Sequence, residues 1–93
     1  LIYAKANMTV ANTKLSKAIE LTHKATFDKD IKLGLGWHII KIGNAEYYFH
    51  NGGTYGCSSF LVFNPEKKFA VVVLSNCGAS IDAVGGEIVK SLQ

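Results

Sequence analysis

The residues best suited to chemistry lie in one short segment, His50–Gly56, with the sequence H-N-G-G-T-Y-G. Glycines let backbone N–H groups face a substrate with no side chain in the way. At the edge of a strand, such a segment can hold an extended substrate and aim an N–H at a developing oxyanion. The histidine beside it can donate a hydrogen bond to a substrate or place a positive charge next to it. The residues alone also fit a plain glycine-rich hairpin with an ordinary histidine, and this alternative stays open.

The remaining histidines and serines give weaker signals. His23 is expected near the end of a helix, where a surface cation suits the helix dipole. His38 is expected on a strand, as a solvent-facing or hydrogen-bonded side chain without a special role. Ser58 and Ser59 have no base close to them in the sequence, so we assign neither as a nucleophile.

The composition indicates a globular domain, because 48% of the 93 residues are hydrophobic and 18% are charged. The net charge of +3 comes from scattered lysines, which indicates a solvated surface, and no nucleic-acid motif occurs. No apolar run approaches the roughly 18 residues of a membrane span, and residues 1–5 lack the order of a signal peptide.

Cys57 and Cys77 are expected to be free, partly buried thiols, and neither a metal site nor another cofactor is expected.

Three helices are expected, two near the start of the chain and one at its end. Residues 1–8 are helix-compatible but begin without a capping residue, which suggests a chain cut inside a helix. A second helix is predicted over 13–24, capped by Asn12-Thr13, and a last one over 80–92, in which Gly85-Gly86 would pack closely on a sheet. The predicted inward-facing residues are Leu15, Ala18, Ile19 and Thr22 in the second helix, and Ile81, Val84, Ile88, Val89 and Leu92 in the last.

Between the helices, the sequence predicts an antiparallel sheet of three to four strands, and therefore an α+β fold. The strands are expected at 33–40, 47–50, 58–63 and 69–74, with turns at Gly43-Asn44 and at 64–67 and with Trp37 and Phe63 in the core. The strand at 69–74 does not alternate, so it is predicted to be central and covered on both faces. The chain supplies helices for about one face, which suggests that a second cover and a neighbouring strand are missing.

Four ordered signals resemble the family of class C β-lactamases, DD-peptidases and related esterases, in the C-terminal part of its members. His50–Gly52 resembles the family's K-T-G or H-x-G strand, and Gly34–Trp37 resembles its G-L-G-W strand. Phe63–Lys68 resembles its F-x-P-E-K-K segment, and Val71–Asn76 resembles the strand V-V-V-L-x-N that follows. The closing residues 89–93 resemble the family's last helix.

The resemblance implies that residues 1–93 are a single C-terminal portion of a β-lactamase/transpeptidase-like fold. In the family, the serine of an S-x-x-K motif attacks the acyl carbon and its lysine helps to take the proton. Neither S-x-x-K nor the family's Y-x-N motif occurs in this sequence. Both are therefore expected in a missing N-terminal portion, and the chain alone is expected to be inactive.

By position in the motif, the resemblance assigns His50 and Gly53 to catalysis. His50 stands where the family has the K-T-G lysine, and the Gly53 N–H would be the second donor to the oxyanion. Asn51, Gly52 and Thr54 are the expected substrate-binding residues, with Asn51 on the substrate's polar tail and Gly52 giving clearance. Histidine is common at this position in the esterase and peptidase branches, which favours these branches over a true β-lactamase.

Three functions are weighed on this basis. The first is hydrolysis through an acyl-enzyme of a small-molecule or peptide substrate, such as a β-lactam, a D-Ala peptide or a small ester. The second is a non-catalytic peptidoglycan-binding homologue, and the third is a small α+β interaction domain. The family suggests a periplasmic, secreted or membrane-anchored bacterial parent. Its members pair the strand equivalent to Phe69–Asn76 with an N-terminal strand, so we expect an unpaired edge there and a homo-oligomer formed through it.

Overall fold

The structure, a computed structural model, describes residues 2–8, 14–29 and 31–92. Its helices are α1 (Ile2–Met8), α2 (Ser16–Thr22) and α3 (Asp82–Leu92), and its strands are β1 (Phe27–Asp28), β2 (Lys32–Leu33), β3 (His38–Ile42), β4 (Ala45–Thr54), β5 (Cys57–Asn64) and β6 (Phe69–Ser75).

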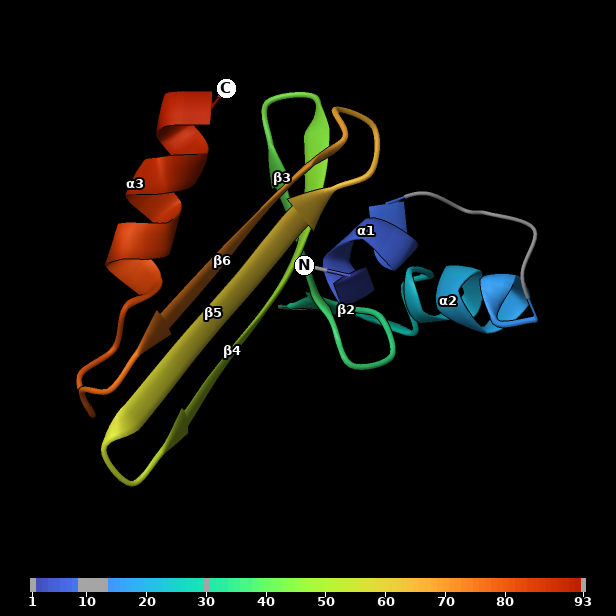
Figure 1. The fold of residues 1–93 in the computed structure, drawn as a ribbon. Helices are drawn as coiled ribbons and strands as arrows, with labels where there is room; N and C mark the ends of the chain where they lie inside the picture. The colour runs from blue at the N-terminus through green and yellow to red at the C-terminus, as the bar shows by residue number, and fades with distance from the viewer. Residues whose placement is uncertain (1, 9–13, 30, 93) are drawn as a thin grey trace.

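The strands form one antiparallel sheet in the order in which they follow in the chain, from β1 to β6. The predicted α+β fold is confirmed, although six strands replace the three to four expected, because the short strands β1 and β2 were not foreseen. Figure 1 shows α3 on one side of the sheet and α1 and α2 on the other. The expectation that the helices cover only one face is therefore wrong. None of the described helices is long and apolar enough to cross a membrane.

The predicted strand 33–40 is wrong, because this stretch is a hairpin. Leu33 of β2 pairs with His38 of β3, and the chain turns between them. The Gly34 N–H donates to the Trp37 carbonyl oxygen at 2.9 Å, and Gly36 has a φ of 81°. Glycine adopts this left-handed conformation readily. The turn that contains Gly34 and Gly36 thus separates β2 from β3.

The other predicted strands are confirmed, each with somewhat wider bounds. Both predicted turns are also found, since the chain reverses at Gly43-Asn44 between β3 and β4 and at 65–68 between β5 and β6. The register from β3 to β6 runs one to one without a bulge. The strands β4, β5 and β6 therefore form one continuous ladder.

The core between the sheet and α3 forms along a narrow seam of the helix. A side chain at Gly85 would collide with the ring of Phe60, so glycine is required there, as predicted. Nothing lies within 4 Å of a side chain placed at Gly86, so the prediction fails for that residue. The cluster of buried residues on this face comprises Ala45, Tyr47, Phe60, Val62, Val71 and Val89.

The predicted inward stripes of the helices are only partly right. The seam runs from Ile81, the residue before α3, to Gly85 and Val89 at four-residue spacing, while Val84, Ile88 and Leu92 are exposed. A helix lying on a sheet with a glycine at the contact buries one such row, which leaves the next row in solvent. The stripe of the second helix is wrong as well: α2 buries no residue, Leu15 and Ala18 are exposed, and Ile19 and Thr22 are half-buried. Its predicted cap, Asn12-Thr13, lies outside the described residues.

The other face carries a second core beneath α1. Trp37 and Phe63 are buried here, as predicted, with 5% and 0% of their surfaces exposed. Their rings meet edge to face with centroids 4.8 Å apart. Ala4 and Asn7 are the buried residues of α1. This face of the sheet is therefore closed around Phe63.

His23 belongs to this second core, so the prediction of a surface cap is wrong. It does follow the last residue of α2, but its ring lies 4.9 Å from that of Tyr48 and 5.4 Å from that of Phe63. Its Nε2 is 2.9 Å from Asn7 Oδ1, and the Asn7 amide nitrogen donates to the Tyr3 carbonyl oxygen. Since Asn7 Oδ1 only accepts, Nε2 carries the hydrogen. Burial lowers the pKa of His23, and the Glu20 carboxylate opposes this shift.

β6 is not a central strand in this structure. Within the described chain it pairs only with β5 and forms one border of the sheet. The predicted unpaired edge along Phe69–Asn76 is thus confirmed over the strand Phe69–Ser75. Val72 and Leu74 are 39% and 76% exposed on it, so the strand is covered less than its apolar sequence suggests.

Candidate active site

The segment His50–Thr54 is an open edge, because β4 extends beyond its neighbour β3. The last pair between these strands joins His38 to Phe49. Beyond it, β4 pairs with β5 alone among the described residues, as far as Thr54 opposite Cys57. The chain before β3 turns away at Gly34–Trp37 and leaves this length of β4 uncovered. We call His50–Thr54 the open edge of β4.

The turns at the two ends of β4 determine which backbone groups point outward from the open edge. In a two-residue turn, the flanking residues form a hydrogen-bonded pair, and such pairs alternate along an antiparallel ladder. Counting from the turn at 42–45, Asn51 and Gly53 direct their N–H and C=O groups to the side that β3 has vacated. Counting from the turn at 54–57 gives the same result. The Gly53 N–H is thus available to a bound molecule, as the oxyanion role requires.

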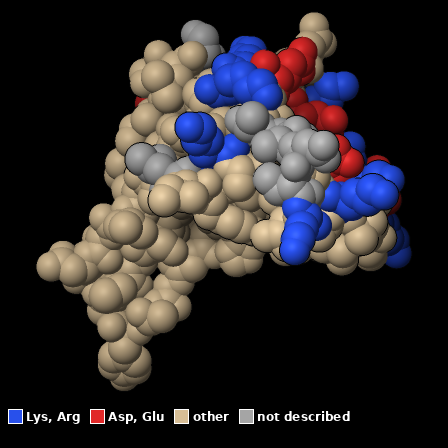
Figure 2. Space-filling view, turned by 45° about the vertical axis from the view of Figure 1, so that its right-hand side comes forward, with Lys and Arg blue, Asp and Glu red and all other residues tan. Residues whose placement is uncertain are grey.

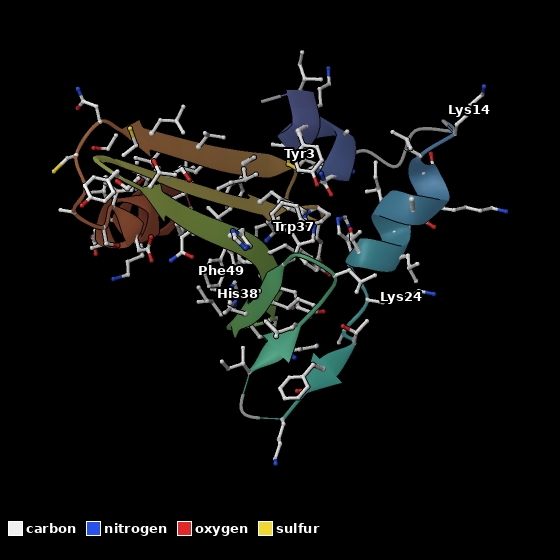
Figure 3. The ribbon with its side chains drawn as sticks, turned by 90° about the horizontal axis from the view of Figure 1, so that it is seen from below. Tyr3, Lys14, Lys24, Trp37, His38 and Phe49 are labelled. Atoms are coloured by element: carbon white, nitrogen blue, oxygen red, sulfur yellow. The ribbon has the colours of Figure 1, made fainter. Side chains whose placement is uncertain are left out.

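His50 lies on the α1 side of the sheet and lines a hollow of about 510 Å³. Tyr3 and Trp37 form part of its wall, with their rings stacked at 6.1 Å (Figure 3). Leu61 and Val72 also line it, so an imidazole borders a largely apolar space. Such a hollow can hold the apolar part of a substrate whose reacting group lies at the strand edge.

His38 lies next to His50, which the sequence analysis missed. Its ring stacks on Phe49 with centroids 5.0 Å apart (Figure 3), and it is 5.8 Å from the ring of His50. A signal for this proximity does exist in the sequence. Counting back from the turn at Gly43-Asn44 pairs His38 with Phe49 and places it beside His50.

The side chain of Asn51 points to the opposite face from that of His50. Its Nδ2 donates to Asp82 Oδ2, in the first turn of α3, at 2.6 Å. The structure therefore separates the predicted site residues, since successive residues of a strand face opposite sides. Only the backbone N–H and C=O of Asn51 point outward from the open edge, because its side chain is bound to Asp82. Asp82 carried no signal in the sequence, because its partner is 31 residues away.

The two glycines of the open edge meet different surroundings. A Cβ on Gly52 would lie 3.0 Å from Ser59 Oγ, so a side chain there would be crowded. A Cβ on Gly53 would have its nearest neighbour, the Cys57 carbonyl oxygen, at 3.8 Å, which is an ordinary contact. Gly52 therefore lies close to Ser59 on the α1 side, and Thr54 is exposed at the end of the strand.

The open edge lies in a stretch of sequence without charged residues, and the Asp82 carboxylate contacts it from the α3 face. No Lys, Arg, Asp or Glu occurs between Glu46 and Glu66 in the sequence. Figure 2 shows the charged residues gathered on the upper part of the visible face, while its lower part has none. The side chains of His38 and His50 bring imidazole rings to this edge, and an imidazole can donate or accept a hydrogen bond.

Two other sequence predictions concern cysteines and metals. Cys57 and Cys77 are unpaired, as predicted, but both are exposed rather than partly buried. Among the described residues, no three His, Cys, Asp or Glu side chains lie together in a way that could hold a metal ion.

Comparison with known proteins identifies the family. No curated protein and no solved structure matches the chain. A family model described as Beta-lactamase matches residues 5–89, a range that includes the open edge of β4 and the turns on both sides of it. The chain belongs to the β-lactamase family.

Proposed function

We propose that this chain is the C-terminal portion of a serine hydrolase that cleaves an amide or ester through an acyl-enzyme. The observation that carries the proposal is the open edge of β4, where the Gly53 N–H points away from β5. The nucleophilic serine and the S-x-x-K lysine would come from an N-terminal portion, because the motif does not occur in these 93 residues.

In the proposed reaction, the substrate lies extended along the open edge and pairs with the backbone of Asn51 and Gly53. The serine oxygen bonds to the carbonyl carbon, and the carbonyl oxygen takes up negative charge. The Gly53 N–H donates to this oxygen, and the N–H of the serine itself is the other donor. The leaving group departs with a proton, and water then releases the acid and restores the serine.

His50 would act on the side of the hollow. Its imidazole borders both the apolar wall and the open edge, so it can donate a hydrogen bond to the leaving group or to the second motif of the family. Gly52 would leave room there for the substrate, and Thr54 would contact the substrate at the far end of the edge. Asn51 would bind through its main chain, since its side chain is engaged by Asp82.

A non-catalytic homologue that binds peptidoglycan peptides is the second candidate. The open edge favours it as well, because strand addition to an exposed edge needs no nucleophile. The two candidates differ in one feature of the complete protein, the presence of S-x-x-K. A complete protein with the motif and with turnover supports the hydrolase, whereas peptide binding without the motif supports the homologue.

The assay compares the 93-residue chain with the complete protein. We expect the chain alone to hydrolyse neither a chromogenic cephalosporin nor a p-nitrophenyl ester above background. The complete protein should hydrolyse at least one of them and should be labelled on its serine by an acylating inhibitor. Serine-dependent turnover by the chain alone, blocked by that inhibitor, would contradict the proposal.

A further inference from the structure

The open edge of β4 needs support from outside its own ladder. Among the described residues it is paired on one side only, it contains two successive glycines, and all of its residues are exposed. Glycine has more backbone freedom than any other residue. An oxyanion donor must nevertheless be held within about 0.5 Å and 10–20° of its working geometry. Some other part of the fold must therefore restrain this segment.

The loop before α3 and the first residue of this helix contact the two strands of the open edge, β5 and β4. From β4, the Asn51 amide donates to Asp82 at 2.6 Å. From β5, the Ser58 hydroxyl lies 3.0 Å from the Cys77 carbonyl oxygen and 2.9 Å from that of Ala79. Ser58 is buried and is the residue paired with Gly53 in the ladder. These contacts thus hold the residue two positions before Gly53 and the residue paired with Gly53.

Asp82 is itself well fixed. Its N–H donates to Ser80 Oγ at 3.3 Å, and its carboxylate lies in the first turn of α3, where the helix dipole favours a negative charge. A hydrogen bond from an amide to a carboxylate is charge-assisted and stronger than one between neutral groups. Asp82 therefore anchors the Asn51 side chain to a helix that packs on the sheet through Gly85 and Val89.

We propose that Asp82 is a positioning residue for the oxyanion edge and acts through Asn51. Holding the Asn51 side chain on the α3 face fixes the peptide groups on either side of it, and the N–H of Gly53 is the next outward donor along the strand. This role rests on the proposed hydrolase function. In this proposal the Asn51 side chain hydrogen-bonds to Asp82 of α3, while the Asn51 backbone hydrogen-bonds to the substrate.

The first test uses the 93-residue chain and nuclear magnetic resonance. Asp82→Ala should shift the amide resonances of Asn51 and Gly53 and raise their exchange rates about tenfold, because the anchor is lost. Asp82→Asn should stay within about twofold of the original, because its Oδ1 still accepts from Asn51. Glu87→Ala is the matched control, since Glu87 lies on the same helix and pairs only at the surface with Lys90. If Asp82→Ala does not fold, Asn51→Ala tests the same bond from β4.

The second test uses the complete hydrolase. Asp82→Ala should lower kcat about tenfold, less than complete removal of an oxyanion donor, with KM changed less than twofold. Asp82→Asn should restore most of the rate, and Glu87→Ala should not change it. Equal rates in Asp82→Ala and Glu87→Ala, or shifted amides with an unchanged kcat, would overturn the positioning role. Absence of any turnover in the unaltered complete protein would count against the proposed function instead, and the amide measurements on the chain would still decide whether Asp82 anchors the edge.

Discussion

Two of the open edges of the described sheet differ in nearly every property except the backbone groups that they present. One is the open edge of β4, which results because β3 starts only at His38. The other is the outer side of β6, which is the last strand among the described residues. By the same alternation from the turn at 54–57, Ala70, Val72 and Leu74 direct their N–H and C=O groups outward there.

The side chains beside these edges suggest different partners. The edge of β4 has glycines, an imidazole and nearby hydroxyls, so a bound strand would gain mainly hydrogen bonds there, and its apolar contact would come from the hollow beside His50. The edge of β6 has the exposed Val72 and Leu74, and covering them would contribute about 25 cal/mol for each Å² of apolar surface buried. We infer that the first edge suits a molecule that must leave again and the second suits a permanent neighbour.

The largest effect is expected from removing the outward donor of β4. Gly53→Pro in the complete hydrolase deletes the N–H that points to the oxyanion while leaving the ladder to β5 intact. We expect kcat to fall by about 10²–10³, measured with an ester or amide substrate. Gly53→Ala is the control, since a Cβ fits there and the N–H remains. Equal losses in both variants would show that the N–H has no special role.

The second-largest effect is expected from a substitution at His50. His50→Ala in the complete hydrolase should lower the acylation rate by about 10², because one electrostatic donor of the site is lost. His38 has no predicted role, so His38→Ala should leave the rate nearly unchanged, although the His38 ring lies 5.8 Å from that of His50. Stopped-flow acylation rates of the two variants decide this. Equal effects would make the two imidazoles one functional unit.

The third prediction concerns the edge of β6. The isolated chain should form a dimer or a larger assembly through this edge, and Leu74→Lys should weaken the association at least about tenfold, since a lysine on an edge opposes strand pairing. Leu92→Lys is the matched control, because Leu92 is also an exposed leucine but lies on α3. Sedimentation at tens of micromolar measures both. A monomeric unaltered chain would remove the proposed permanent partner and would leave the family assignment standing.

Much of the fold could be predicted from the sequence, because local signals fix turns and strands. The turn at Gly43-Asn44 and the strands on both sides of 65–68 follow from residue types that permit few other conformations. The hairpin at 33–38 was missed, because the residues around Gly36 read as one strand and the backbone conformation of a glycine has no signature in its neighbours. That hairpin is what leaves β4 open.

The candidate site could be predicted less completely. The motif and the glycines predict His50–Gly53 as the site, and the structure adds the direction of each N–H. The bond between Asn51 and Asp82 was out of reach, because it depends on how α3 docks on the sheet. The inward position of the His23 ring could not be predicted either, because it depends on how α2 lies against Tyr48 and Phe63 of the sheet.

The smallest effect is expected from His23, and it contrasts the covered part of β4 with its open edge. Burial lowers the pKa of His23 in the folded state, whereas the unfolded value is near 6.5. The unfolded chain therefore binds more protons in the interval between the two values. The contribution of the neutral ring to stability is complete above pH 6.5, and it declines as the pH falls toward the lowered folded value.

Urea unfolding at one protein concentration should show this acid-side loss as a lower midpoint at pH 5 than at pH 7.5. His23→Gln should remove the loss, because its amide still donates to Asn7 at every pH, and His38→Gln should retain it. Hydrogen exchange locates the effect. Acid should raise exchange at Tyr48, which packs on His23, more than at Gly53, which does not. Equal acid responses at the two amides would mean that the covered and open parts of β4 are not separate in stability.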